Sequence, residues 1–317
     1  MTVQDPMSFQ DWGLATVGAQ TVWQTGNMGT QSCLVCHMDT GYDVNNPDLS
    51  QNLWTGSDGS HGLNVVVAPP SSAVQDDHGH GTAVASVMGA AANSWGVQGV
   101  SPVLTIAPCK WLDATGNGGN DKALACLTWC ASLKPHVVHG SWGEYADVAG
   151  FLPLMQAMAA NGTLFVFSAG NDGLNSSASP HFPSGYLQAV PGAVFSVAAI
   201  ERFDLAVWPG SNWGASSVNI AAPHTVICDG LGDSFPVVSG TSIAAPFVTG
   251  VIGLAYAWLQ ASGVDITPKK SLASAVFKAV QGGTLDVTQS ERGIGGGIVH
   301  APTAIAVLRS SMRGTEL

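Results

Sequence analysis

Short apolar runs that alternate with longer helix-like stretches constrain the fold of this chain more than any other sequence feature. The runs are bounded by Gly, Pro, Asn or Asp and cover 32–38, 63–67, 103–110, 136–139, 163–168 and 193–199. Helix-like stretches lie at 82–92, 121–133, 148–160 and 242–260. Runs without polar alternation are typical of strands buried on both faces, and strands that alternate with helices form a parallel sheet between helices. We therefore expect an α/β fold: a three-layer, doubly wound, mostly parallel sheet with helices on both faces.

Composition and charge exclude several classes of protein. Hydrophobic residues make up 46% of the chain and charged residues 10%, against about 25% charged in average proteins, so the chain can bury a large core. No repeat or linker divides the sequence, and we expect a single domain over 1–317. The net charge of −11, without Lys or Arg clusters, argues against nucleic acid as a partner. The apolar run 243–259 contains Pro246, which favours a buried helix over a membrane span.

The six cysteines leave disulfide pairing open, because connectivity cannot be read from spacing alone. Cys33 and Cys36 have the spacing of a redox motif, but they lie inside a strand-like run. Residues i and i+3 of a strand face opposite sides, and no helix N-terminus is present there to lower a thiol pKa. We expect these two to be buried apolar cysteines. His37, between them and the end of the run, is unusually polar for a core strand, and a buried hydrogen bond would account for it.

Four segments that follow predicted strands carry side chains used in catalysis: Asp39, His80, Asn171 and Ser242. A serine hydroxyl needs a base to remove its proton, and histidine is the natural base near neutral pH. A buried carboxylate fixes the imidazole tautomer, and an Asn amide can stabilise negative charge on an oxygen. Taken singly, each segment also fits a turn or a helix cap. Together they supply a complete set for acyl transfer.

Other chemistries explain fewer of these residues. An aspartic-peptidase site needs two Asp-Thr-Gly or Asp-Ser-Gly copies, and only one is present. His78, His80 and either Asp76 or Asp77 could bind zinc, but ligands two residues apart on a turn converge poorly without a third, distant group. An α/β-hydrolase esterase built on Ser242, Asp286 and His300 lacks the final glycine of Gly-x-Ser-x-Gly and leaves the other segments unexplained.

The chain resembles the subtilisin-like serine peptidases, or subtilases, whose triad order is Asp, His, Ser. The motifs that carry the resemblance are Asp39-Thr-Gly41, His80-Gly-Thr-Ala-Val-Ala85, Ser168-Ala-Gly-Asn171-Asp-Gly173 and Gly240-Thr-Ser242-Ile-Ala-Ala-Pro246. By this resemblance Ser242 is the nucleophile, His80 the base, Asp39 its orienting carboxylate and Asn171 the oxyanion donor. His78 is expected to be a bystander.

The resemblance also implies a substrate cleft that holds an extended peptide between two segments. Its predicted residues are Gly116 and Gly118 on one side and Ser141, Trp142 and Gly143 on the other. The pocket for the residue before the cut is expected to include Ser168, Ala169, Gly170 and Ser184. Neither 168–170 nor 182–185 contains Asp or Glu, which favours an apolar or aromatic residue before the cut.

A structural calcium site is the last expectation taken from the resemblance. The family's calcium loop is similar to 91–97, and the implied ligands are Asp5, Asp48, Ala91, Asn93, Trp95 and Val97. Oxygen ligands in a flexible loop suit calcium better than zinc.

We therefore expect a serine endopeptidase that acts on polypeptide substrates through an acyl-enzyme. A transpeptidase or macrocyclase using the same intermediate, and a catalytically silent peptide-binding module, are the alternatives. Neither nucleic acid nor a membrane is an expected partner. The family usually requires a propeptide, so a removed propeptide and an extracellular or secretory location are expected, with the targeting segment absent from this sequence.

Overall fold

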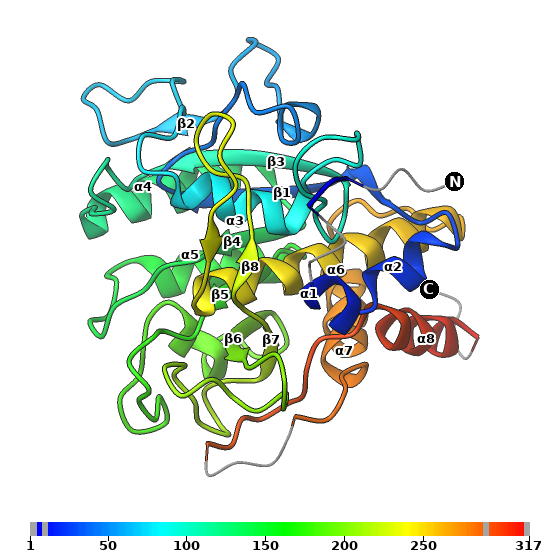
Figure 1. The fold of residues 1–317 in the computed structure, drawn as a ribbon. Coiled ribbons are helices and arrows are strands. Elements are labelled where there is room, and N and C mark those ends of the chain that lie inside the picture. Colours follow the sequence, from blue (N-terminus) through cyan, green and yellow to red (C-terminus); the bar gives the residue numbers. More distant parts are fainter. Residues whose placement is uncertain (1–4, 8–11, 288–291, 314–317) are drawn as a thin grey trace.

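A computed structural model describes residues 5–7, 12–287 and 292–313, and its centre is a seven-stranded parallel sheet (Figure 1). The strand order is β2-β3-β1-β4-β5-β6-β7. The strands are β1 Gly29–Asp39, β2 Leu63–Asn64, β3 Val103–Lys110, β4 Val137–Gly140, β5 Leu164–Ser168, β6 Val194–Ile200 and β7 Ile220–Pro223. A separate antiparallel pair joins β8 Val226–Ile227 to β9 Val237–Val238. The predicted α/β fold is confirmed, and β7 is a strand that the sequence pattern did not indicate.

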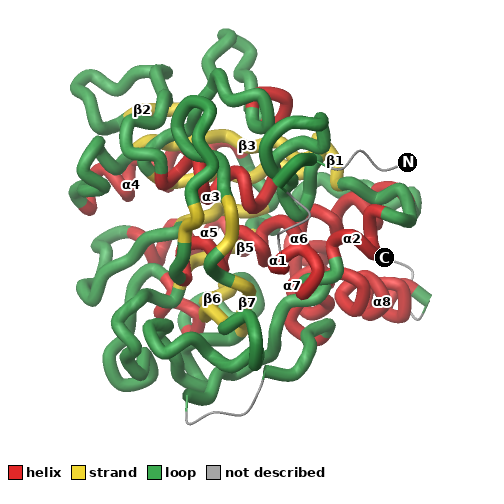
Figure 2. The backbone as a smooth tube through the Cα atoms, viewed as in Figure 1, coloured by secondary structure: helices red, strands yellow, loops and turns green. Residues whose placement is uncertain are grey.

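The four expected helices are present, with boundaries shifted by up to three residues. They are α3 His80–Gly89, α4 Asn120–Leu133, α5 Phe151–Ala160 and α6 Thr241–Ala261. Four further helices were not predicted: α1 Trp12–Thr16, α2 Ala19–Trp23, α7 Lys270–Gly282 and α8 Ala301–Met312. Short 3₁₀ helices cover Ser50–Asn52 and Ser184–Gln188, and long loops connect many of the elements (Figure 2). The five-residue helices α1 and α2 are too short for a periodic signal to detect.

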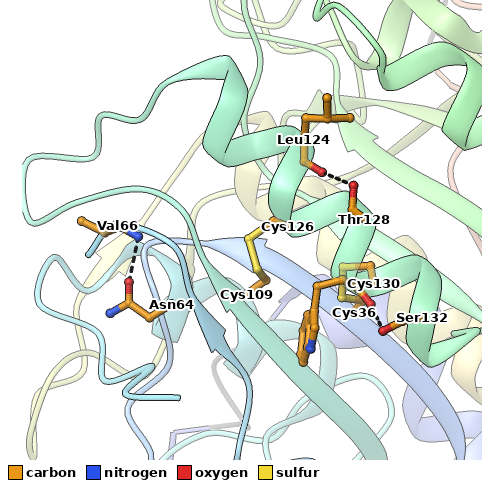
Figure 3. The surroundings of a disulfide bond; sticks show 10 residues. Cys36, Asn64, Val66, Cys109, Leu124, Cys126, Thr128, Cys130 and Ser132 are labelled. Carbon is orange, nitrogen blue, oxygen red and sulfur yellow. Dashed lines mark hydrogen bonds between the residues drawn. A yellow bond between two sulfur atoms is a disulfide. The ribbon is translucent and has the colours of Figure 1, made fainter. Parts of the chain in front are cut away.

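Two helix layers cover the sheet on opposite faces. Helices α3 and α6 pack together against β1 on one face. On the other face, α4 is joined to the sheet by two disulfides, Cys36–Cys130 to β1 and Cys109–Cys126 to β3 (Figure 3). The expectation that Cys36 is a buried apolar thiol is therefore wrong, because α4 brings Cys130 against it. Cys33 is a buried free thiol, as expected.

Helix α6 passes through the centre of the molecule (Figure 1). It is long and apolar enough to cross a membrane by length and composition, but 89% of its most apolar window is buried inside the protein. Its side chains pack on β1, β4, β5, β6 and β7. The prediction of a buried core helix is confirmed.

The strand order changes direction at β1. The chain passes from β1 to β3 on one side, and then returns to β4 on the other side of β1. In open parallel sheets, ligands bind beyond the carboxyl ends of the strands at such a switch point. Asp39 ends β1, and Ser141 follows β4 directly.

Candidate active site

Asp39 and His80 are in direct contact at this edge of the sheet. The Nδ1–H of His80 donates to Oδ1 of Asp39 at 2.7 Å, and the backbone N–H of Thr40 donates to the same oxygen at 2.7 Å. Asp39 is fully buried, whereas the side chain of His80 is 24% exposed. With Nδ1 protonated, Nε2 of neutral His80 carries the lone pair that a general base needs.

The two groups stabilise each other's charged forms. Burial lowers the pKa of His80, but the charge and hydrogen bond of Asp39 outweigh it, so the pKa lies above its ordinary value. Burial raises the pKa of Asp39, but the charge and hydrogen bond of His80 outweigh this too, so the pKa lies below its ordinary value. The carboxylate is thus ionised at neutral pH, ready to stabilise an imidazolium.

The start of α3 is held so that His80 meets Asp39. The carboxylate of Asp76 accepts the backbone N–H groups of His78, Gly79 and Thr82 at 2.9 to 3.0 Å, which satisfies the unpaired donors of the first helical turn. A side chain at Gly81 would overlap the carbonyl oxygen of Gly41. Only glycine at position 81 therefore lets the helix approach the Asp39 turn this closely.

Ser242 lies in the first turn of α6, beside Asn171. Oδ1 of Asn171 accepts the backbone N–H of Thr241 at 2.8 Å and its hydroxyl at 2.9 Å. These bonds commit the amide oxygen, so the amide nitrogen is left as the donor toward the cleft. The N-terminus of a long helix also places unpaired N–H groups and positive potential around Ser242.

Helix α3, which begins at His80, packs against helix α6, whose first turn contains Ser242. A side chain at Gly250 would lie 3.1 Å from the carbonyl oxygen of Met88, and Leu104 lies against both Gly89 and Gly253. The two helices therefore pack closely at this point. His80 precedes Met88 by eight residues and Ser242 precedes Gly250 by eight, so each lies about 12 Å along its own helix from this contact.

Two buried histidines form hydrogen bonds to the first turns of α3 and α6, one directly and one through Ser141. Nε2 of His37 donates to the carbonyl of Gly81 at 3.0 Å, which is the buried hydrogen bond expected for this polar residue. The hydroxyl of Ser141 donates to the carbonyl of Ser242 at 2.7 Å and accepts from Nε2 of His139 at 2.9 Å. Burial lowers the pKa of both histidines, so both are neutral. The side chain of Ser141 thus supports the serine motif instead of facing the cleft.

The two predicted sides of the cleft line one cavity of about 230 Å³. Its lining includes Trp111, Gly116 and Gly118 from one side and Trp142 and Gly143 from the other. The Trp111 and Trp142 rings meet edge to face, 4.5 Å between centroids. The residues of both predicted sides of the cleft thus line the same cavity, together with the two indole rings.

The predicted pocket wall beyond β5 is also beside Ser242. The backbone N–H of Gly170 donates to the hydroxyl of Thr241 at 3.2 Å, and the carbonyl of Ala169 accepts from Asn212 at 2.9 Å. Ser168 is buried, and Ser184 donates to the carbonyl of His181 at 2.9 Å. Asn212 and His181 were not predicted, since nothing in their local sequence marks them.

The predicted calcium ligands gather around the loop after α3. Asp5 accepts the backbone N–H groups of Asn93 and Ser94, and Oδ2 of Asp48 accepts that of Val97 at 2.9 Å. Trp95 donates its backbone N–H to Oδ1 of Asn93 at 2.9 Å, and Ala91 donates to the carbonyl of Asp48 at 2.8 Å.

Asp229, after β8, joins this loop although the sequence analysis did not select it. Asp229 is fully buried, and in the described part of the chain no N–H or O–H group donates to either of its carboxylate oxygens or to Oδ1 of Asp48. Burial and the charge of Asp48 raise the pKa of Asp229, and burial raises that of Asp48. Within the described ranges, no three His, Cys, Asp or Glu side chains form a ready metal-ligand set. A cation here would need carbonyl oxygens of the loop as well.

The residues of the esterase alternative have other surroundings. Nδ1 of His300 hydrogen-bonds Oγ1 of Thr303 at 3.0 Å, and its ring lies against Gly18. His300 therefore belongs to the packing of α8 against the N-terminal helices, whereas His80 contacts a carboxylate beside the serine motif.

Comparison with known proteins gives one consistent family. The model of the Subtilase family matches residues 30–290. Subtilisin-like protease 2 of Plasmodium falciparum (isolate 3D7) is 31% identical over 78% of this chain, which spans 19% of that relative. Halolysin of Haloferax mediterranei is 28% identical over 84% of the chain and 49% of its own length. The major intracellular serine protease of Bacillus subtilis is 26% identical over 93% of the chain and 89% of its own length. The chain thus spans less than half of the length of the first two of these relatives.

Proposed function

Because this chain belongs to the subtilase family, we propose that it is a serine endopeptidase in which Asp39, His80 and Ser242 form the catalytic triad. The observation that carries the proposal is the 2.7 Å hydrogen bond from His80 to the buried carboxylate of Asp39. The helix that begins at His80 packs against α6, whose first turn contains Ser242. We also propose that the enzyme prefers substrates with an uncharged, apolar residue before the cut, because segments 168–170 and 182–185 carry no carboxylate.

In the proposed mechanism, Ser242 attacks the peptide carbonyl while Nε2 of His80 takes its proton. Asp39 holds the imidazole by Nδ1–H and stabilises the positive charge that forms. The amide nitrogen of Asn171 and the backbone N–H of Ser242 stabilise the oxyanion. His80 then gives its proton to the leaving amine. In the second half, water attacks the acyl carbonyl while His80 takes its proton, and His80 returns that proton to the departing oxygen of Ser242 as the acid is released.

A fluorophosphonate probe tests the proposal, because it forms a covalent bond only with an activated serine. We expect one equivalent to attach to the folded protein, and peptide mapping to place it on Ser242. Heat-denatured protein should stay unlabelled. Labelling of no residue in folded protein would instead favour the silent peptide-binding module.

The substrates and location follow from the same family membership. We propose polypeptide substrates, a propeptide removed on maturation, and a secretory or extracellular location. The two disulfides, Cys36–Cys130 and Cys109–Cys126, support an oxidising compartment. One relative, the minor extracellular protease Epr of Bacillus subtilis, is named as an extracellular enzyme, and the major intracellular serine protease of the same organism is named as an intracellular one.

We also propose that calcium binds between the loop 91–97 and the carboxylates of Asp48 and Asp229. Buried carboxylate oxygens without donors favour a cation or a shared proton, since two bare charges cannot stay buried side by side. Asp48, Asp5 and carbonyl oxygens of the loop would hold the ion, as the family resemblance implies, and Asp229 would add a carboxylate from the segment before β9. The ion would stabilise the fold and take no part in the reaction.

The raised pKa values of Asp48 and Asp229 predict how stability depends on pH. Without a cation, the folded protein keeps protons that the unfolded chain loses above pH about 4, so stability should fall as pH rises into the neutral range. Calcium replaces these protons. At a hundredfold excess over Kd it should add about 2.7 kcal/mol, a few degrees in Tm, and the gain should be larger at pH 8 than at pH 5.

Thermal unfolding with calcium or with a chelator measures this effect. Asp229→Asn should reduce both the calcium gain and the loss of stability at pH 8. Asp233→Asn removes an exposed carboxyl from the same loop and should change neither. Equal Tm values with calcium and with chelator at pH 8 would rule the site out.

A further inference from the structure

The space that receives the side chain before the cut lies between the segments that follow β4 and β5. These strands are hydrogen-bonded neighbours, with Gly140 opposite Phe167. Gly143 lies beyond β4 and Gly170 beyond β5, and both segments are bonded to the first turn of α6 through Ser141 and Gly170. A substrate whose carbonyl meets Ser242 would direct its preceding side chain between these two glycines.

The imidazole of His181 fills that space. A methyl group at Gly143 would overlap Cε1 of His181 and lie 2.7 Å from its Nε2. A methyl group at Gly170 would lie 3.1 Å from both Cδ2 and Nε2 of the same ring. The ring therefore touches both walls of the pocket, and His181 is only 5% exposed.

Hydrogen bonds with Ser184 hold the His181 ring in one orientation. The hydroxyl of Ser184 donates to the carbonyl of His181 at 2.9 Å, so at 3.2 Å it must accept from Nδ1–H of the ring. Nε2 consequently carries a lone pair toward the glycines. Burial lowers the pKa of His181 to about 4, which keeps the ring uncharged at neutral pH. Reciprocal backbone hydrogen bonds between Phe182 and Glu144 join the segment that contains His181 to the segment after β4.

A second set of contacts covers the ring from the solvent side. Tyr145 meets His181 edge to face, 5.4 Å between centroids. The hydroxyl of Tyr145 donates to Asp172 at 2.6 Å and accepts from the amide of Asn212 at 3.0 Å. Moving the imidazole out of the pocket would break the contacts with both Ser184 and Tyr145.

We propose that His181 is a specificity-determining residue that closes the pocket and restricts cleavage to sites after a small side chain, such as Ala, Gly or Ser. The inference rests on the proposed peptidase function and narrows it. Aromatic side chains, which the sequence analysis also allowed, have no room beside the ring. A side chain of one carbon or one hydroxymethyl group needs only the mouth of the pocket.

The test uses two peptide substrates that are identical except for Ala or Phe before the cut. The wild-type protein should favour Ala in kcat/KM by roughly 100-fold or more, since steric exclusion of a ring exceeds the effect of a single methylene. His181→Ala should empty the pocket and raise kcat/KM for Phe at least about tenfold. His181→Leu is the matched control, because it keeps the pocket filled and should still exclude Phe.

Two further readouts separate the possible failures. Fluorophosphonate titration counts active sites, so a protein that takes no label overturns the proposed function itself. A labelled wild-type protein that cleaves after Phe as well as after Ala overturns the role of His181, even if a variant fails to fold. A folded His181→Ala variant, checked by thermal unfolding, that gains no activity toward Phe overturns it as well.

Discussion

Ser242→Ala should abolish fluorophosphonate labelling and nearly all peptide hydrolysis. The hydroxyl is the only proposed nucleophile, and without it no acyl-enzyme can form. In subtilisin, itself a member of this family, loss of the serine lowers kcat by about 10⁶-fold, and we expect a loss of that order. Steady-state hydrolysis of a peptide substrate, normalised to protein concentration, measures the effect.

The variant should stay folded, because Ser141 bonds the main-chain carbonyl at position 242, which alanine retains. Ser262→Ala removes an exposed hydroxyl near the other end of the same helix and serves as the control with unchanged activity. Normal turnover by Ser242→Ala would refute the serine-peptidase mechanism.

The histidine pair gives the second large effect. His80→Ala should lower kcat by about 10⁶-fold, the loss measured for the catalytic histidine of subtilisin, because His80 is the base hydrogen-bonded to Asp39. His78→Ala should keep activity within a few fold. The ring of His78 lies 6.3 Å from that of His80, centroid to centroid, and beside Gly116 at the edge of the cleft.

The kcat and KM values of the two variants, measured side by side, make this comparison. A small change in KM for His78→Ala fits its place at the cleft. An equal collapse of kcat in both would revive a metal site or a paired-histidine mechanism and contradict the role given to His80 alone.

The sequence predicted the sheet and the residues at its carboxyl edge because that information is local. Strands buried on both faces are rich in apolar residues, and polar residues at or just beyond their ends, such as Asp39 and Asn171, stand out against that background. Together with His80 and Ser242 near the starts of two helices, they favoured acyl transfer before any distance was known and left a silent peptide-binding module as an alternative.

Local patterns were weaker where elements are short or exposed. Helices α1 and α2 have five residues each, so the helical period of 3.6 residues does not repeat within them. Cys36 looked like an apolar core residue, because its partner Cys130 is 94 positions away. That pairing depends on how α4 packs across the face of β1.

Tertiary structure alone decided the two features that most refine the function. The ring of His181 lies between Gly143 and Gly170, which belong to the segments after β4 and β5. Asp229 lies with Asp48 because the chain after β8 folds against the loop that follows α3. Neither residue differs locally from a surface histidine or aspartate. Their surroundings come from segments tens to hundreds of residues away, and burial, charge coupling and pocket volume exist only once those segments have packed together.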